Sequence, residues 1–512
     1  MIPMLLLSIL IPLLAGLLLT LPCFPPHRLT AVTMPCHLSL AAGIGIGVLS
    51  CLYFLVMLPS QASVLVYLDS ALAVGLTALA ALLYKKGFFR KSGILTPQEN
   101  IPLRYGRIFP VLFTGTLISA LISVAVALLK EPHGKWDAWV IWNLHARFIL
   151  RGGEHWRDFL AGGPDWTHPD YPLLVPLSVV RMWKYAGSET LYGPIFFSVL
   201  FMLAVAGLLV FTLAILRSRG QGYLAGLVLM GSPYFLDLSA SQFADIPLAF
   251  YFLATVIIFF LHDRFDHRHD TPLMLAGLTA ALAAWTKNEG LLFLSIVPMV
   301  RFAFITRSNG WKRALRQVGW FMAGALPVVM VIALFKIQLA PSSDIFAGQG
   351  LQQMIDKLTD LHRFGQISLA YLQTALTFTQ GAVNIRTGFH VNPGVAGVIL
   401  LSLYMLFMGV RTQAQDRTAL LTAAAVLIFM LAGYFAIYLI TPHDLHWHLL
   451  TSLNRLFIQL WPSAIFLCFM ITRTPEQALA TSLFREVQTS LSGPKVSPRT
   501  TKKSAGKQKR LP

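Results

Sequence analysis

Long apolar runs recur from one end of the chain to the other, and short polar stretches separate them. A helix of about 17 to 25 apolar residues crosses a hydrocarbon core of about 30 Å, so each run predicts a transmembrane helix. The pattern predicts an all-α, polytopic membrane protein with about 13 transmembrane helices. The predicted spans lie near residues 2–21, 38–58, 63–84, 108–129, 190–216, 222–238, 246–262, 272–286, 289–306, 317–339, 395–411, 418–440 and 456–472.

One long polar stretch, residues 135–172, interrupts this pattern and predicts a large water-facing loop. Within it, residues 136–150 are followed by Gly152-Gly153, which predicts a helix lying in the membrane interface. Six of the eleven tryptophans lie in or beside the loop. Indole rings prefer the headgroup region, so anchoring is favoured over stacking on a sugar ring. These residues are Trp136, Trp139, Trp142, Trp156, Trp166 and Trp183.

The composition is that of a membrane protein, since 56% of the residues are hydrophobic and 12% are charged. The first run has no basic residue before it and no small-residue cleavage site after it, so we expect a retained helix rather than a signal peptide. The four cysteines show no spacing typical of a disulfide framework or a metal cluster. No phosphate-binding glycine loop is present, so any activated donor is expected to be a lipid.

The formal net charge of +18 comes from basic residues concentrated in alternate loops, which favours a membrane surface and not nucleic acid as the partner. By the positive-inside rule these loops face the cytoplasm, as expected in an inner (plasma) membrane. Residues 135–172, 237–245, 338–392 and 443–455 then face the periplasm or the exterior. The basic loop residues are Lys85, Lys86, Arg90, Lys91, Arg104, Arg107, Arg217, Arg219, Arg301, Arg307, Lys312, Arg313, Arg316, Arg411 and Arg417.

The distribution of charge along the chain predicts three parts. Residues 1–107 form N-terminal accessory membrane helices and a basic cytoplasmic loop. Residues 108–472 form the main membrane domain, whose outward-facing loops carry carboxylates, histidines or arginines. Residues 473–512 are basic and rich in small polar residues, which predicts a disordered cytoplasmic tail attracted to anionic lipid.

Asp137 has two interpretations. At the first turn of the predicted interfacial helix, its carboxylate would be stabilised by free backbone amides and the helix dipole. Between Trp136 and Trp139 at a membrane surface, it would instead be a partly desolvated general base. The sequence alone leaves both interpretations open.

Asp245 begins a later span, just before Pro247, and so is also a candidate helix cap. If the packing of the bundle brings it close to Asp137, the two carboxylates could divide acid and base roles or share a cation. A divalent metal cation is therefore the candidate cofactor.

Residues 286–290 interrupt a hydrophobic segment after only about fifteen apolar residues, a length that barely crosses the membrane. Irregular backbone at this depth is typical of a polar cavity, and charges there are candidates for function. Lys287 and Glu289 form a structural ion pair in one interpretation. In the other, Lys287 binds a lipid phosphate.

A dense polar patch lies between residues 441 and 455. The spacing of His443, His446 and His448 matches no closed zinc pattern, so hydrogen bonding to a sugar or phosphate is favoured over a structural metal. Arg455 is the expected anion partner.

Taken together, these residues resemble the membrane glycosyltransferases of the C fold class (GT-C), in particular the bacterial relatives of protein O-mannosyltransferases and of the lipid A aminoarabinose transferase. The resemblance covers about residues 108–472. In that superfamily an acidic residue follows a span in the first outer loop, a His-Pro-Pro-Leu-like segment closes the loop, a second acidic residue begins a later span, and a Thr-Lys pair breaks a helix. The matching residues here are Asp137, His168-Pro169-Asp170-Tyr171-Pro172-Leu173, Asp245, and Thr286-Lys287 with Gly290.

The resemblance implies an enzyme that transfers a sugar, with inversion, from a polyprenyl-phosphate-linked donor to a hydroxyl of a lipid, glycan or protein acceptor. The reaction would modify cell-envelope glycans or glycolipids on the periplasmic face. Asp137 would be the general base, and Asp245 would orient the acceptor or help to hold the cation. Lys287, Arg455 and His168 would stabilise the departing phosphate. Asp170 and Glu289, with the three histidines of the polar patch, are further candidates.

Two other classes of protein fit the same pattern. A polytopic transporter or lipid flippase would also have many spans, a broken helix and intramembrane charges, without glycosyl transfer. A noncatalytic assembly partner would carry these residues without needing them for transfer. The carboxylates cluster at one face and do not follow a path across the membrane, and this favours the enzyme over the transporter.

Overall fold

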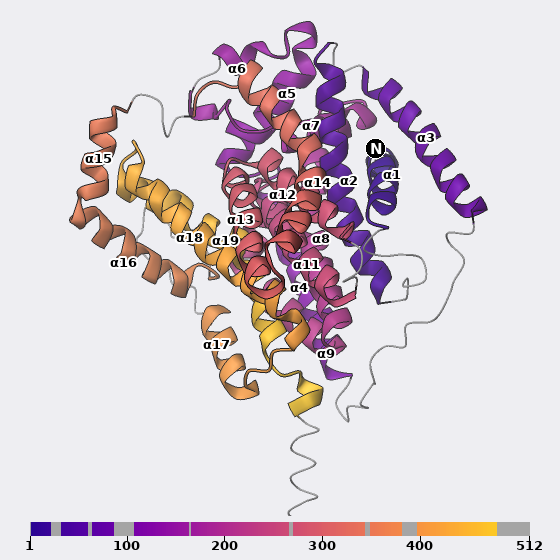
Figure 1. The fold of residues 1–512 in the computed structure, drawn as a ribbon. Helices are drawn as coiled ribbons and strands as arrows, with labels where there is room; N and C mark the ends of the chain where they lie inside the picture. Colours follow the sequence, from indigo (N-terminus) through magenta and orange to yellow (C-terminus); the bar gives the residue numbers. More distant parts are fainter. Residues whose placement is uncertain are drawn as a thin grey trace, which may run out of the picture.

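The computed structural model describes residues 2–21, 32–59, 64–86, 107–162, 165–265, 270–343, 349–380 and 397–478. Most of the basic loop before residue 107 and most of the predicted tail lie outside the described residues. In the described part of the chain the regular structure is helical, apart from an isolated bridge between Val410 and Thr472. The predicted all-α class is confirmed (Figure 1).

Nine helices among the described residues are long and apolar enough to cross a membrane. The chain is therefore a multi-pass membrane protein. These helices are α2 (Thr33–Met57), α3 (Leu65–Lys85), α4 (Ile108–Lys130), α8 (Tyr192–Leu216), α11 (Asp245–Phe265), α13 (Glu289–Asn309), α14 (Trp311–Gln338), α18 (Arg417–Ile440) and α19 (Leu445–Ile471).

The predicted number of thirteen spans is not confirmed. Three of the predicted spans are shorter apolar helices: α1 (Ile2–Leu19), α12 (Pro272–Thr286) and α17 (Gly397–Met408). The continuous span predicted at 222–238 is wrong, because the chain there forms two short helices, α9 (Arg219–Met230) and α10 (Pro233–Ala240). Gly231 ends the first helix, and Pro233, which has no backbone N–H, fits the first turn of the second.

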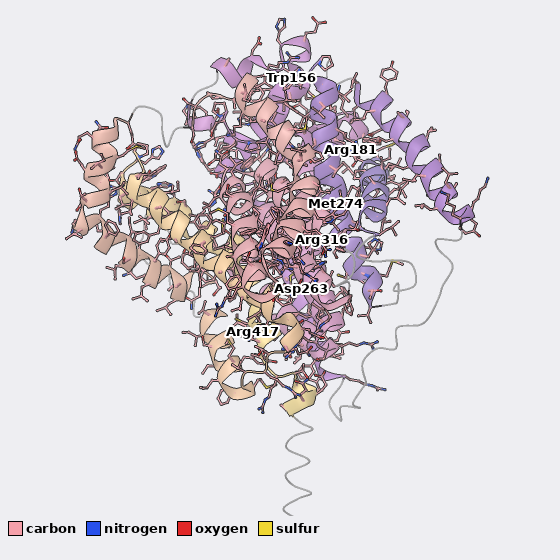
Figure 2. The ribbon with its side chains drawn as sticks, in the orientation of Figure 1. Trp156, Arg181, Asp263, Met274, Arg316 and Arg417 are labelled. Atoms are coloured by element: carbon pink, nitrogen blue, oxygen red, sulfur yellow. The ribbon has the colours of Figure 1, made fainter. Side chains whose placement is uncertain are left out.

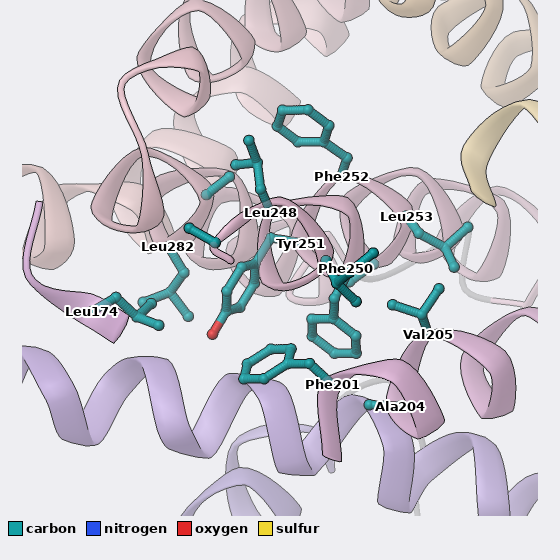
Figure 3. Packing of buried hydrophobic residues seen from close by; sticks show 14 of the residues in the cluster. Leu174, Phe201, Ala204, Val205, Leu248, Phe250, Tyr251, Phe252, Leu253 and Leu282 are labelled. Atoms are coloured by element: carbon teal, nitrogen blue, oxygen red, sulfur yellow. The ribbon is translucent and has the colours of Figure 1, made fainter. Parts of the chain in front are cut away.

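Helix α11 lies at the centre of the bundle. Its apolar stretch, which is long enough to cross the membrane, is buried completely inside the protein. Its Phe250 and Tyr251 rings lie 5.6 and 6.0 Å from the ring of Phe201 in α8 (Figure 3). A Cβ atom at Gly43 of α2 would lie 2.1 Å from the Phe250 ring, so any larger residue there would displace this ring. Since lipid tails are as apolar as these side chains, close packing of this kind stabilises the bundle.

Helix α3, from the part predicted to be accessory, is exposed along most of its length but is joined to the bundle by one buried ion pair. Asp69 accepts a hydrogen bond of 2.6 Å from Arg181 in α7 (Leu174–Ala186) and one of 2.5 Å from Tyr185. An unpaired charge among apolar helices is costly, so this pairing fixes α3 against α7.

The two kinds of loop lie at opposite ends of the bundle. Trp156, in the loop 135–172, lies at one end, and Arg417, from one of the predicted cytoplasmic loops, lies toward the other (Figure 2). We call the first the outer end and the second the inner end.

Residues 136–151 of the loop 135–172 form a continuous helical segment, as predicted for residues 136–150, with a π-helical turn inside it. The chain forms a π-helix at Ala138–Trp142 and then a short α-helix, α5 (Asn143–Arg151). Single-turn π-helices inside α-helices are frequent at functional sites. The loop continues with the short helices η4 (Gly153–His155), α6 (Asp158–Gly162) and η5 (Asp165–Thr167), whereas α15 (Leu351–Thr359) and α16 (Leu361–Thr377) pack against α18 at the side of the bundle (Figure 1).

The tryptophans of the loop divide into two groups. Three are exposed, by 48–62%, which suits the predicted anchoring, and three are buried in the protein, so anchoring is wrong for them. The exposed group is Trp136, Trp139 and Trp166, and the buried group is Trp142, Trp156 and Trp183.

Candidate functional site

Asp245 lies at the start of α11 with its side chain fully buried at the outer end. Its carboxylate accepts hydrogen bonds from Gln459 Nε2 at 2.6 Å, from Arg455 Nη2 at 2.8 Å and from Lys287 Nζ at 3.3 Å. The donors come from α19 and from the break between α12 and α13. One carboxylate therefore joins three helices of the bundle.

Arg455 connects the two carboxylates that the sequence proposed as a pair. Its Nη1 lies 2.7 Å from Asp137 Oδ2, and its Nη2 lies 2.8 Å from Asp245 Oδ2. The guanidinium also lies over the Phe243 ring, 4.6 Å from its centroid, in a favourable cation–π position. Asp137 and Asp245 are thus brought together, and in this arrangement a guanidinium compensates their charge.

Asp137 lies in the first turn of the helix, as predicted, but its side chain makes no capping hydrogen bond to the helix. Its carboxylate pairs with Arg455 instead, and the side chain remains 20% exposed. Of the carboxylates around Arg455, Asp137 is accessible from outside, whereas Asp245 is not.

The segment before α11 holds the outer loop in place. Lys135 forms a 2.5 Å ion pair with Asp237, and Asn143 donates a 3.0 Å hydrogen bond to Gln242. The Gln242 side chain in turn donates to the carbonyl of Pro132. Gln242 has a φ of 61°, a backbone conformation that residues other than glycine rarely adopt and that is common at functional sites.

The predicted break at 286–290 is present. Helix α12 ends at Thr286, Lys287 is extended, and α13 begins at Glu289. A Cβ atom at Gly290 would lie 2.1 Å from the carbonyl oxygen of Ala283, so the sharp turn requires glycine.

Lys287 is buried and pairs with two carboxylates. It forms the structural pair with Glu289 at 2.7 Å and also contacts Asp245 at 3.3 Å. Gln459 Nε2 lies 3.5 Å from Glu289, and its side-chain carbonyl accepts a 2.9 Å bond from Tyr434. The ion-pair interpretation of Lys287 is therefore confirmed, while its binding of a phosphate stays a prediction.

We call these residues the outer cluster: Asp137, Asp245, Lys287, Glu289, Arg455 and Gln459. The cluster holds three carboxylates and two cationic groups, so full ionisation leaves an excess of one negative charge. In the described part of the chain, no group of three or more His, Cys, Asp or Glu side chains lies close enough to hold a metal ion. Binding of a divalent cation stays a prediction, and no such group of three ligands among the described residues supports it.

Asp170 is 3% exposed and lies beside the break in the α12–α13 segment. Its carboxylate accepts a 2.7 Å hydrogen bond from Asn288, and its backbone carbonyl accepts a 2.6 Å bond from Lys336 of α14. The segment that closes the outer loop is thus fixed next to Lys287.

His168 belongs to a row of stacked aromatic rings in the outer loop. Its ring stacks on Tyr171 at 4.8 Å, and Tyr171 stacks on Trp142 at 5.6 Å. His168 has a φ of 48°, a second uncommon conformation at the outer end. Burial lowers the pKa of neighbouring His145 to about 3, so this imidazole is neutral at physiological pH. Contact of His168 with a phosphate stays a prediction.

Two histidines of the polar patch lie close to each other near the start of α19. His448 Nδ1 lies 2.9 Å from Thr441 Oγ1, and its ring lies 5.6 Å from that of His443. His446 is exposed to solvent. Arg455 lies about two turns further along α19 and points to the carboxylates.

Three residues of the site were missed by the sequence reasoning. Gln459 lies four residues after Arg455, on the same face of α19, so helical spacing was a usable signal. Lys336 was a lone cation near the end of a predicted span, and such residues are candidates for function. Asn288 carried no signal, because its role depends on a partner 118 residues away.

Comparisons with protein-family models, curated proteins and solved structures found no match for this chain.

Proposed function

We propose that the outer cluster is the active site of a glycosyltransferase that uses a polyprenyl-phosphate-linked sugar. The observation that supports this most is the arrangement around Arg455, where an accessible carboxylate, Asp137, lies beside buried cationic groups at a break in a helix. Such a site offers a base for a hydroxyl and cations for a phosphate, at the end of a membrane bundle where a lipid-linked donor arrives from the bilayer.

Asp137 acts as the general base. The acceptor hydroxyl gives its proton to Asp137, and its oxygen attacks the anomeric carbon as the bond from that carbon to the phosphate oxygen breaks. The polyprenyl phosphate leaves from the opposite side, so the configuration inverts. A positioned base contributes about 10²- to 10⁴-fold to the rate.

Lys287 and Arg455 stabilise the charge that develops on the leaving phosphate. Both cations are occupied by carboxylates, so the donor phosphate competes with Asp137 for Arg455. When the phosphate binds the guanidinium, the Asp137 carboxylate loses its cationic partner and becomes a stronger base. Binding of the donor therefore increases the basicity of Asp137.

Asp245 anchors the other groups, because it is fully buried and its two oxygens are held by Arg455, Lys287 and Gln459. This role replaces the direct contact with the acceptor that the resemblance implies. Asp245 fixes the direction of Arg455 and Lys287 and keeps their charge in place.

The proposed location is the inner (plasma) membrane with the outer cluster facing the periplasm, on the argument that the basic loops face the cytoplasm. The acceptor is then a lipid, glycan or protein of the cell envelope.

The experiment is mass spectrometry of envelope glycolipids and glycans from a deletion strain and from the same strain carrying the wild-type gene. We expect one sugar to be missing in the deletion strain and restored by the gene. An unchanged set of envelope glycans would contradict the proposal. Movement of a lipid-linked sugar across proteoliposomes by the purified protein, with no new glycosidic bond, would support the transporter instead.

A further inference from the structure

Lys336 contacts two separate segments beside the outer cluster. It lies near the C-terminal end of α14, and its ammonium donates to the backbone carbonyl of Asp170 at 2.6 Å and to the side-chain carbonyl of Asn288 at 2.9 Å. Its side chain is 26% exposed. The outer loop and the helix break are therefore both bound to α14.

A third hydrogen bond closes a ring. The amide of Asn288 donates to the Asp170 carboxylate at 2.7 Å, so each of the three residues is bonded to the other two. Lys336 Nζ lies 3.7 Å from the nearest Asp170 carboxylate oxygen, further than from either carbonyl. The two carbonyls therefore fix the position of the ammonium more closely than the ion pair does.

The ring acts on the segment that carries Lys287. Asn288 is the residue between Lys287 and Glu289, where the backbone passes from α12 to α13. Lys287 is extended there, and its backbone makes one hydrogen bond to each side: its N–H donates to the carbonyl of Ala283 at 3.2 Å, and its carbonyl accepts from the N–H of Gly290 at 2.9 Å. Fixing the side chain of Asn288 on two sides restricts this short turn and thereby the direction of the Lys287 side chain.

We propose that Lys336 is a positioning residue for lipid-phosphate binding. Through its bonds to Asn288 and Asp170, it orients the side chain of Lys287. This inference rests on the proposed function, because it assigns to Lys336 the support of the cation that holds the donor phosphate. It also gives Asp170, which lies between the two prolines of the segment that closes the outer loop, a defined task.

The experiment measures the affinity of the full-length protein in lipid nanodiscs for undecaprenyl phosphate, with a neutral polyprenol as the reference lipid. We expect Lys336→Met to bind undecaprenyl phosphate about tenfold more weakly than wild type, the size of losing one hydrogen bond to a charged group. Lys336→Arg, which keeps the charge and the donors, should stay within about threefold of wild type. Lys312→Met is the matched control, since Lys312 is an exposed lysine of the same helix.

A double variant separates positioning from a general structural role. If Lys336 acts through Lys287, then Lys287→Met/Lys336→Met should bind no more weakly than Lys287→Met alone. Additive losses, or wild-type affinity in Lys336→Met, would overturn the inference. If Lys336→Met does not fold, Asn288→Ala removes the same connection and is measured in its place, with the same two outcomes.

Failure of the proposed function gives a different result. Wild-type protein that binds undecaprenyl phosphate no better than the neutral polyprenol would overturn the lipid-phosphate site and the positioning role together. Wild-type binding that is lost in Lys287→Met but kept in both Lys336→Met and Asn288→Ala would overturn the positioning role alone.

Discussion

The protein buries ionic groups at both ends of the bundle, and the two sets differ in charge balance and in backbone regularity. We call the second set the inner network; its labelled members, Asp263 and Arg316, lie below the centre of the bundle in Figure 2. Its ion pairs are Arg301–Asp263 at 2.5 Å, Arg316–Asp270 at 2.7 Å and Arg264–Asp416 at 2.8 Å, with His262 between Asp263 and Asp270. The three aspartates are buried, whereas the Arg316 side chain is 56% exposed.

In the inner network each of the three aspartates has its own arginine, whereas the outer cluster has three carboxylates for two cations. The non-glycine residues with positive φ in the described part of the chain, His168 and Gln242, both lie at the outer end. The π-helix and the helix break also lie there. Buried charge is therefore common to both sets, whereas uncommon backbone conformations and an accessible carboxylate distinguish the outer cluster and support its proposed function.

The largest expected effect is on the stability of the inner network. Arg301→Met leaves the buried Asp263 without its closest cation. Breaking a buried ion pair in this way lowers the free energy of unfolding by about 3–5 kcal/mol. We expect a clear fall in the melting temperature of the detergent-solubilised protein. Arg307→Met is the control, because Arg307 is exposed on the same helix. A melting temperature equal to that of the control would show that the inner network does not stabilise the fold.

A substitution in the outer cluster should weaken the binding of a lipid phosphate. Lys287→Met removes the cation proposed to hold the donor phosphate, and we expect undecaprenyl phosphate to bind about 10- to 100-fold more weakly. Lys130→Met, at an exposed lysine at the outer end of α4, should bind as wild type does. Equal affinity of the two variants would contradict a difference in function between the two ends.

The smallest expected effect is a pH dependence at the outer end. The imidazole of His145 has its pKa lowered by burial from 6.5 to about 3, so between these values the unfolded chain binds a proton that the folded chain does not. The free energy of unfolding should therefore fall as the pH drops below about 6.5, by about 1–2 kcal/mol between about pH 7.5 and 5.5.

Unfolding curves at several pH values test this contribution. His145→Phe should lose this part of the acid sensitivity, whereas His133→Phe, at an exposed position, should keep it. An unchanged pH dependence in His145→Phe would contradict a buried neutral imidazole.

The sequence predicted the features that depend on local composition. The break at Lys287 was found because the run before it is too short to span, and Asp137 and Asp245 were found as carboxylates next to apolar segments. The span at 222–238 was mispredicted because hydropathy averages over Gly231 and Pro233, which end and begin separate helices.

The features that depend on packing between distant segments could not be predicted. Whether Arg455 would join the histidine patch or the two carboxylates is decided by the rotation of α19 in the bundle. The task of Asp170 became visible only when α14 brought Lys336 beside it. Hydrogen bonds between segments more than a hundred residues apart leave no periodic signal in one sequence.

The most direct test of the central claim is the ability of Asp137→Asn to restore the envelope sugar that the deletion strain lacks. Transfer should fall by about 10²- to 10⁴-fold, because the amide cannot accept the proton of the acceptor. Asp158→Asn, at an exposed carboxylate in the same loop, should restore the sugar fully. With equal amounts of folded protein in the membrane, we predict that the Asp137→Asn strain lacks the sugar. Wild-type amounts of the sugar in that strain would contradict Asp137 as the base and the outer cluster as the active site.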